Sequence, residues 1–463
     1  MSRPSIYCIS VAEAALLSDT MRIALFLLLA VPLWAQEPLS VRQAAQLALH
    51  QNHAVAAAAA GVAAAGARVT QAHSGLLPKV NYSESFTRSD NPVFVFSSLL
   101  TQHQFGPEDF NIGPLNRPDA LNNSQSLLTV DQVLYDAGQT RHAVQSAEIG
   151  RKLTGEEQRR VEMETIAGTV RSYYDAVLAG ASLKAADQAY LSAEADLRRA
   201  EDVRAAGMST DADVLSIRVH LAAVKEQRIA RTADLDVARA ALNDALGLPL
   251  DAPHDLTTEL TPLASAMPVL EGLQHDASSA RPEVRETQLA RSLAETQAAS
   301  ARAALLPEVS FRAAFEADRQ RVVTRGGANW LAQVSLRWNI FNGFSDNARI
   351  EESSHMVQRA EAEMARVNSA VALQVRRSYA GLDAASQRIA VATVAVAQAE
   401  ESLRITQNRY QAGMANVTEL LRTETALLEA RTHHLEAIRD QRVAAAQLEL
   451  AAGHLSADSE VLN

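Results

Sequence analysis

Short stretches in which apolar and polar residues alternate occur in two pairs along the chain. In the second pair, residues 309–316 and 332–340, nearly every second residue is apolar. The first pair, residues 80–87 and 128–135, follows the pattern less strictly, and Glu84 interrupts its apolar face. A period of two places alternate side chains on opposite faces of a β-strand. The pattern therefore predicts four strands, each with one apolar and one polar face.

Each pair of strands is followed by a long stretch in which apolar residues recur every three to four positions. Residues 139–206 and 345–412 each hold 68 residues without a proline. At a rise of 1.5 Å per residue, a helix of this length is about 100 Å long. A shorter Ala-rich helix is predicted from the cap-box pair Ser40 and Gln43 to His73.

A similar turn follows each long helix. Residues 204–215 read RAAGMSTDADVL, and residues 410–421 read YQAGMANVTELL. Gly207 and Gly413 can adopt the left-handed conformation that closes a helix, where a Cβ would be strained. Each turn is therefore predicted to be the tip of a hairpin between two helices.

The residues after each tip glycine predict the start of a return helix. Thr210 with Asp213, and Asn416 with Glu419, fit the pattern of a capping residue followed three positions later by an acid. The first return helix is expected to end near Leu246.

The two halves of the chain repeat one another in register. Matching landmarks are separated by 206 positions, whereas the Leu-Pro pairs before the strands are separated by 229. The first strand hairpin therefore carries 23 additional residues, which we assign to its loop. The landmarks are Tyr135 and Phe341, Arg171-Ser172-Tyr173 and Arg377-Ser378-Tyr379, Gly207 and Gly413, and Gly247 and Gly453.

This register divides the chain into four parts. Residues 1–35 comprise an upstream extension and a signal peptide. Residues 36–250 form the first repeat, with a long exposed loop at 90–122 and a tip near residue 207. Residues 251–277 are predicted to be a linker. Residues 278–463 form the second repeat, with a tip near residue 413 and a C-terminal tail.

The signal peptide is predicted to begin at Met21 rather than at residue 1. Met21-Arg22 provides the charged start, Ile23–Val31 the apolar run, and Ala35 the small residue before the cut. The one cysteine, Cys8, lies in the segment that would be removed. The exported chain is therefore expected to lack a disulfide and a cysteine for a lipid anchor.

The composition argues against several classes of function. A net charge of −11 argues against nucleic acid as a partner, and 19 glycines and 14 prolines in 463 residues favour long helices. The 12 histidines do not form the pairs with acids that would indicate a zinc site, and no catalytic motif is present. We therefore predict a protein that is not an enzyme and holds no cofactor or metal.

The four strands are each about as long as needed to cross an outer membrane. Four strands cannot close a membrane barrel, because the smallest barrels have about 8 strands and unpaired edges are costly in lipid. Three copies would supply 12 strands, and the long helices would pack as a coiled-coil tube. The predicted fold is a mixed α/β membrane protein with a trimeric 12-stranded barrel continued by an α-helical barrel.

The alternation also assigns the two faces of the second strand pair. The residues expected to face lipid are Val309, Phe311, Phe315, Val334, Leu336 and Trp338. The residues expected to line the lumen are Ser310, Arg312, Gln333 and Arg337.

Several motifs resemble those of the TolC-type outer-membrane efflux protein family, over nearly all of residues 37–453. They are Leu76-Leu77-Pro78 and Leu305-Leu306-Pro307, the strand ends Tyr135-Asp136-Ala137-Gly138 and Phe341-Asn342-Gly343-Phe344, and the two Ala-Gly-Met tips. The resemblance implies a homotrimeric channel in the bacterial outer membrane that extends into the periplasm. It also implies a periplasmic adaptor and an inner-membrane pump as partners. Many relatives carry an acylated N-terminal cysteine, which this chain lacks.

The resemblance implies roles for the two tips. Asp213 and Glu419 match positions where the family places carboxylates at the periplasmic aperture, although each can equally be a helix-capping acid. Arg422 departs from the family pattern, which often has a second acid there. At helical spacing, Arg422 would pair with Glu419 and weaken the charge ring.

The Gly-Met pairs of the tips match the motif with which the family contacts its adaptor. The residues are Gly207, Met208, Gly413 and Met414. The alternative is a plain helix C-cap covered by a methionine.

Three functions remain under consideration. The first is the passive exit duct of a tripartite efflux system, and the second is the outer-membrane component of type I protein secretion. The third, a periplasmic helical adaptor, is opposed by the duplicated hairpin and the four alternating strands. A purely structural coiled coil would need neither these strands nor a signal peptide.

Overall fold

The computed structural model describes residues 38–264, 267–323 and 326–462. The predicted signal peptide and Cys8 lie outside these residues. The strands are β1 (Pro38–Leu39), β2 (Lys79–Ser89), β3 (Leu121–Tyr135), β4 (Asp255–Leu256), β5 (Glu308–Arg319) and β6 (Gly327–Arg337). The helices are α2 (Val41–Gln51), α3 (His53–His73), α4 (Pro92–Thr101), α5 (Ile112–Asn116), α6 (Gln139–Ala205), α7 (Asp211–Leu246), α8 (Leu270–Ala280), α9 (Pro282–Ala303), α10 (Ser345–Gln411) and α11 (Val417–Ala452).

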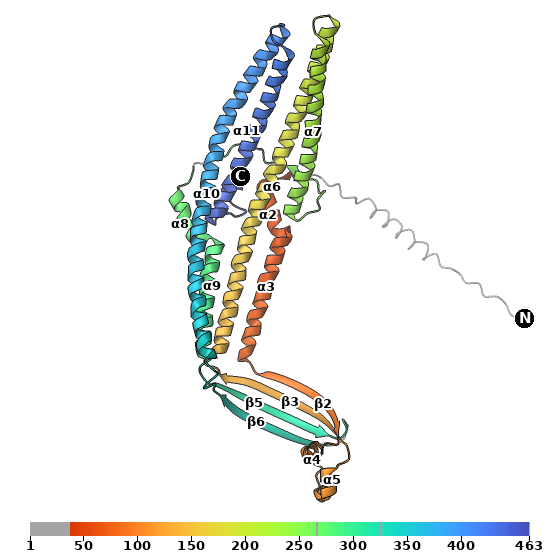
Figure 1. Cartoon of the computed structure of the whole chain (residues 1–463), viewed down its shortest axis with the longest axis vertical. Coiled ribbons are helices and arrows are strands. Elements are labelled where there is room, and N and C mark those ends of the chain that lie inside the picture. Colours follow the sequence, from red (N-terminus) through yellow and green to blue (C-terminus); the bar gives the residue numbers. More distant parts are fainter. Residues whose placement is uncertain (1–37, 265–266, 324–325, 463) are drawn as a thin grey trace, which may run out of the picture.

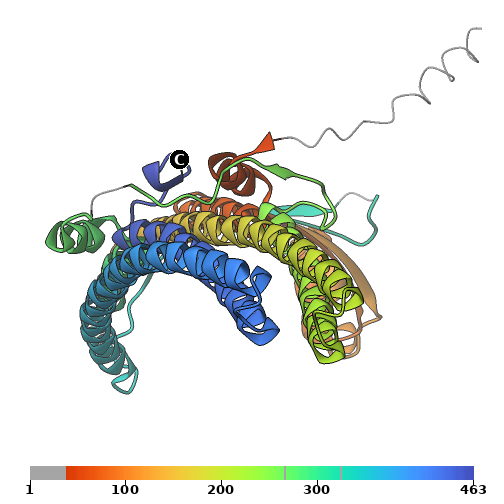
Figure 2. The ribbon, with the colours of Figure 1, turned by 90° about the horizontal axis from the view of Figure 1, so that it is seen from above.

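The molecule is elongated, with a sheet at one end and the tips of two helical hairpins at the other (Figure 1). α6 and α7 form the first hairpin, and α10 and α11 form the second. α6 and α10 each have 67 residues, close to the predicted length. Seen from above, the long helices follow one arc, and the C-terminus lies on its convex side (Figure 2). None of the described helices combines the length and apolar character required to cross a bilayer.

The sheet has four antiparallel strands in the order β2-β3-β5-β6. Val309 pairs with Leu336, and Phe311 pairs with Val334, so these apolar side chains share one face. Trp338 lies beyond the end of β6, and its indole Nε1 donates to the Leu305 carbonyl at 3.0 Å. The prediction that the strand continues to Ile340 is therefore wrong, and Trp330, paired with Phe315, lies on the apolar face.

The opposite face of the sheet is polar and carries ion pairs between neighbouring strands. Arg312 Nε lies 2.5 Å from Asp131 Oδ1, and Arg337 Nη2 lies 2.6 Å from Glu308 Oε2. Gln125 Nε2 donates to a carboxylate on β5 at 2.7 Å. Cross-strand pairs of opposite charge stabilise a sheet and fix its register.

Glu84, which interrupts the apolar face, is satisfied by polar neighbours on that face. It accepts hydrogen bonds from the hydroxyls of Tyr82, Ser124 and Ser126 at 2.5–2.9 Å, and Arg319 lies 3.7 Å away. A carboxylate with this many donors is much less costly outside water than an isolated one.

The segment 90–122 is not a loop throughout, which corrects the prediction. It contains α4, the short 3₁₀ turn Pro107–Phe110 and α5, and β3 begins at Leu121, earlier than expected. α4 forms because Asn91 caps it through the amides of Val93 and Phe94, and proline occupies its first position. Gln102 after α4 is buried and donates to Asn123 Oδ1 at 2.9 Å, which anchors this segment to β3.

Two further boundaries differ from expectation. The helix predicted from Ser40 to His73 is divided at Asn52, which caps α3 through the Ala54 amide and donates to the Ala245 carbonyl at 2.9 Å. The segment predicted as a linker, 251–277, contains β4 and the start of α8. β4 pairs in parallel with β1, and the buried Tyr173 hydroxyl holds this pair by donating to the Leu39 carbonyl at 2.7 Å.

Candidate functional site

The first hairpin tip closes α6 with a left-handed glycine. Gly207 has φ +77°, and the Met208 amide donates to the Val203 carbonyl at 3.0 Å. This six-to-one bond is typical of a Schellman motif. The Met208 side chain is 74% exposed.

The second tip has the same geometry. Gly413 has φ +72°, and the Met414 amide donates to the Arg409 carbonyl at 2.8 Å. Met414 is 66% exposed. The prediction that both glycines close their helices in the left-handed conformation is confirmed.

Asp213 completes a capping box at the start of α7. Its Oδ2 accepts from the Thr210 amide at 3.2 Å, the Thr210 hydroxyl at 2.8 Å and the Ser209 hydroxyl at 3.2 Å. The Thr210 hydroxyl, followed by the Thr210 amide, lowers the pKa of Asp213 below its usual value of 3.8. Asp213 therefore caps the helix as an ionised carboxylate.

Glu419 makes a different set of contacts at the second tip. Its amide donates to Asn416 Oδ1 at 2.8 Å, but its carboxylate faces Arg409, with Oε1 3.4 Å from Arg409 Nη1. Arg409 also donates to the Met414 carbonyl at 3.3 Å, which holds the guanidinium over the turn.

The predicted pair between Glu419 and Arg422 is therefore wrong. Arg422 is exposed and forms no ion pair within the described part of the chain. Arg409 pairs with Glu419 because its position at the end of α10 places it directly across the short turn from Glu419. Helical spacing alone cannot reveal a partner on the other side of a turn.

The two tips lie at the same end of the molecule, and an apolar cluster joins them (Figure 1). The buried members of this cluster are Ala200, Val214, Ile217 and Val417. Tyr410 packs against it, and burial followed by the charge of Asp213 raises the pKa of the Tyr410 hydroxyl. This contact was not predicted from the sequence. The apolar residues at the starts of α7 and α11 indicate that each helix has a buried face, but they do not indicate which element packs against it.

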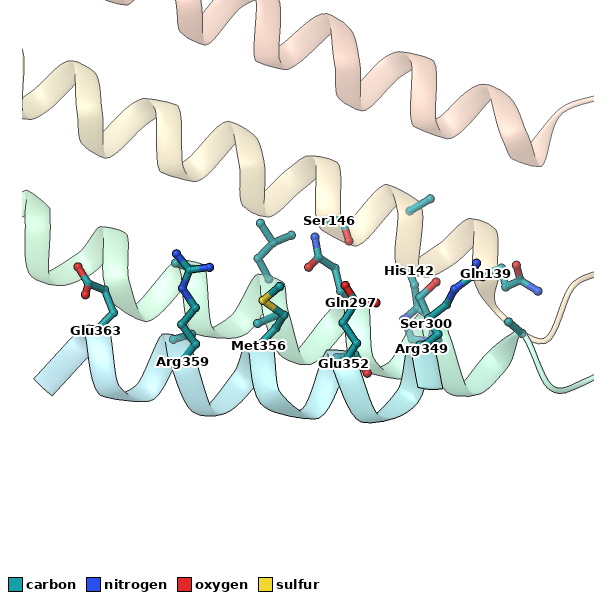
Figure 3. A pocket seen from close by; sticks show the side chains of 18 residues that line it. Gln139, His142, Ser146, Gln297, Ser300, Arg349, Glu352, Met356, Arg359 and Glu363 are labelled. Carbon is teal, nitrogen blue, oxygen red and sulfur yellow. The ribbon is translucent and has the colours of Figure 1, made fainter. Parts of the chain in front are cut away.

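A cavity of about 620 Å³ lies between α6, α9 and α10, close to the sheet (Figure 3). Arg349, Glu352, Arg359 and Glu363 of α10 line it together with His142 of α6. The cavity thus carries both charge signs and was not predicted from the sequence. Within the residues that the structure covers, no three His, Cys, Asp or Glu side chains are arranged to hold a metal ion.

Comparisons with known proteins agree on one family. Residues 44–248 and 273–454 match the family described as outer membrane efflux protein. The chain is 29% identical over 348 residues to Protein CyaE of Bordetella pertussis, covering 73% of this chain and 72% of that protein. It is 24% identical over 376 residues to the outer membrane efflux protein BepC of Brucella suis, covering 80% of each chain.

Solved structures share the fold. The Campylobacter jejuni CmeC outer membrane channel superimposes with a TM-score of 0.76 at 16% identity, covering 92% of this chain and 88% of that one. The outer membrane protein VceC of Vibrio cholerae gives a TM-score of 0.73 at 18% identity, covering 89% and 96%. Because the family match spans both helical hairpins and most of the described residues, the chain belongs to the outer membrane efflux protein family.

Proposed function

We propose that three copies of this outer-membrane exit duct assemble into one channel with a 12-stranded barrel. The observation that carries the proposal is the four-stranded sheet, whose outer strands β2 and β6 each have one edge with no partner strand among the described residues. In lipid, unpaired backbone groups cost several kcal/mol each, so the edges must be covered. β2 of one copy and β6 of the next are the edges that would pair.

The two faces of the sheet support this arrangement. The apolar face would contact lipid, with Leu336 and Val334 exposed in the single chain. The polar face, with the pairs Arg312–Asp131 and Arg337–Glu308, would line the lumen. This alternation is that of a transmembrane barrel with a polar interior.

The helices would continue the barrel as a tube. The long helices of one chain follow an arc (Figure 2), and three such arcs can complete a ring. The tube would cross the periplasm, with the hairpin tips at the end remote from the membrane.

The repeat of residues 36–250 and 278–463, joined by 251–277, is part of this proposal. α7 and α11 both have 36 residues and end at left-handed glycines, Gly247 and Gly453. Gly247 lies against the backbone of Asn52 between α2 and α3, and Gly453 lies against Arg281 between α8 and α9. Equivalent close approaches in both halves support a duplicated unit.

The tips would contact a periplasmic adaptor, which in turn joins an inner-membrane transporter. Gly207 and Gly413 create the turns, and the exposed Met208 and Met414 offer flexible apolar side chains to a partner. Such a duct acts passively, so the proposal gives the chain no catalytic step.

Asp213 and Glu419 would form two acidic rings at the aperture of the trimer, with Arg422 near the second ring. Rings of carboxylates favour cations. Arg409, which contacts Glu419, would partly neutralise the second ring.

The oligomeric state tests the assembly directly. The mature protein in detergent is expected to have the mass of a trimer by light scattering corrected for bound detergent. A stable, folded monomer under the same conditions would contradict the barrel.

A further inference from the structure

The segment that joins β2 to β3, residues 90–120, is much longer than the turn that joins β5 to β6. That turn spans only residues 320–326. The longer segment contains α4 and α5 and lies at the end of the sheet remote from the long helices (Figure 1). We call residues 90–120 the collar segment. A barrel of paired strands does not require it, so the collar segment calls for a role of its own.

The collar segment is folded around a small core. Val95 and Ser98 of α4 are buried, with 7% and 4% of their surface exposed. The Phe105 ring packs edge to face against Phe96 of α4 and against Phe110, with ring centroids 4.8 and 5.1 Å apart. These aromatic contacts hold the chain that follows α4 close to the helix. The segment is therefore a compact unit with a defined position.

Polar contacts fix the end of α4 to three strands of the sheet. Gln102 Nε2 donates to Asn123 Oδ1 of β3 at 2.9 Å, and Asn123 Nδ2 donates to Asp318 Oδ1 of β5 at 2.6 Å. Asn329 Nδ2 of β6 donates to the Thr101 carbonyl at 3.2 Å. Gln102 and Asp318 are 1% and 0% exposed. Because buried polar groups are costly to leave unpaired, these bonds hold the end of α4 firmly.

The strand register places these contacts on the polar face of the sheet. Arg312 lies on that face, and Asp318 lies six positions further along β5, so their side chains point the same way. The pairing of β3 with β5 puts Asn123 on this face too. Gly327 pairs with Asp318, and a Cβ on Gly327 would overlap the Thr101 carbonyl oxygen. The end of α4 therefore covers the polar face and not the apolar one.

In the proposed trimer the polar face lines the lumen, so three collar segments would lie inside the outer end of the barrel. Barrels of about 8 strands are filled by side chains, and barrels of about 16–18 strands leave an aqueous channel. A 12-stranded barrel would thus have a lumen of intermediate width. A helix with its side chains is about 10–12 Å across, so three copies of α4 would occupy much of this exit.

We propose that the three collar segments form a constriction at the outer mouth of the duct, which limits the size of the molecules that leave it. Gln102 and Asn123 are positioning residues that hold each segment over the lumen. The constriction rests on the proposed trimer and on the polar face lining its lumen.

Labelling of a lumen thiol from outside the cell tests the constriction in the full-length trimer. Gln333→Cys provides the only thiol expected in the mature chain, and it lies about 20 Å along β6 from Gly327, on the same face. Intact cells are treated with a small maleimide, or with the same maleimide carried on a polyethylene glycol chain too large for general porins. The small reagent is expected to label the thiol, and the large reagent is expected to be excluded.

Shortening the collar segment should remove this exclusion. Deleting residues 95–117 removes the 23 additional residues of the first hairpin and leaves a loop close in length to residues 320–326. The second hairpin shows that a turn of that length can join two strands of this sheet. In trimers of otherwise unchanged assembly, the large reagent is expected to label the deletion variant at a rate that approaches the rate of the small reagent.

Point variants test whether the position of α4 matters. Gln102→Ala removes the donor to Asn123, so the end of α4 should detach from β3 and the large reagent should label faster than in the wild-type segment. Gln104→Ala is the matched control, because Gln104 is exposed and the bond between Gln102 and Asn123 remains. This control should exclude the large reagent.

Two results would overturn the constriction, and they have different consequences for the duct. If trimers with the intact collar segment are labelled equally fast by both reagents, the constriction is wrong and the duct stands. If the small reagent labels Val334→Cys faster than Gln333→Cys, or the chain is a monomer, the assignment of the faces or the assembly is wrong. The constriction then falls together with the proposed function.

Discussion

Arg409 at the end of α10 faces Glu419 in the first turn of α11, with Nη1 3.4 Å from Oε1. The pair crosses the second tip, and a hydrogen bond from Arg409 to the Met414 carbonyl keeps the guanidinium in place. The first tip has a related pair, since Arg204 Nε lies 2.5 Å from Asp211 Oδ1. At both tips, an arginine at the end of the long helix therefore contacts an acid in the first turn of the return helix.

Removing Arg409 should expose the charge of Glu419. In Arg409→Gln, cation preference in planar-bilayer recordings is expected to increase, because Glu419 loses its neutralising partner. The free energy of unfolding should change by about 1 kcal/mol or less, since the pair is solvent exposed. Arg404→Gln, which breaks an exposed pair with Glu401 on the same helix, is the matched control and should leave selectivity unchanged.

Neutralising Asp213 and Glu419 should separate the effect of their charge from their role in helix capping. Asp213→Asn with Glu419→Gln retains groups that can accept hydrogen bonds near the helix start, so folding and trimer assembly should be nearly intact. Cation preference should fall, because the carboxylates are gone. Unchanged selectivity in the assembled double variant would show that these acids serve as caps and not as aperture charges.

Asp213 should remain ionised in mildly acidic solution. Its pKa lies below 3.8 because Thr210 and Ser209 donate to the carboxylate. Because the pKa of Asp213 is lower in the folded state, its ionised carboxylate stabilises the fold at pH values above the unfolded-state pKa. This stabilisation is lost as the pH falls through the folded-state pKa. In a Glu419→Gln background, the remaining cation preference should therefore persist from about pH 8 to about pH 4.

Conductance selectivity measured from about pH 8 down to about pH 3 checks the prediction. In Thr210→Ala, which removes the hydroxyl donor, the loss of preference should move to higher pH, toward the ordinary value of 3.8. A loss of preference near pH 6 in the Glu419→Gln background would instead assign the selectivity to another group.

Charge on the apolar face of the sheet should be costly. Leu336→Lys is expected to destabilise the assembled barrel by about 2–4 kcal/mol if the site lies near the middle of the bilayer. Gln333→Lys lies on the opposite face of β6, with side chains that would line the lumen, and should cost much less. Denaturant titration of the reconstituted trimer measures both, and equal costs would contradict the assignment of the two faces.

The tip glycines should be needed because of their left-handed backbone conformation, and not because a side chain would clash with neighbouring atoms. A Cβ at Gly207 or Gly413 would meet no atom within 4 Å, yet both residues have positive φ. Alanine at either position should therefore cost about 1–2 kcal/mol from the backbone alone. Gly168→Ala, at an open helical position of α6, should instead stabilise the helix by about 1 kcal/mol.

Thermal unfolding of the three alanine variants provides the comparison. If the tips also contact the adaptor, Gly207→Ala and Gly413→Ala should weaken adaptor binding, whereas Gly168→Ala should not. Tip variants as stable as Gly168→Ala would contradict the requirement for left-handed glycine.

The sequence by itself determined the features that depend on neighbouring residues. Gly207 and Gly413 end the long helices, and the cap at Thr210 starts the next one, because backbone conformation and capping are local. The strands β5 and β6 were evident because their alternation runs over many residues. The apolar and polar faces followed from the same period.

Only the tertiary structure decided which helix faces meet and which charges become partners. Gln102, directly after α4, is buried and hydrogen bonded to Asn123 of β3. This contact anchors a segment whose composition is typical of a loop but which contains α4. Arg409 reaches Glu419 across a turn, and His220 Nε2 lies 3.5 Å from Oε2 of Glu424, far away in the sequence. Local periodicity indicates that a helix has a buried face, but the partner of that face depends on how the hairpins pack together in three dimensions.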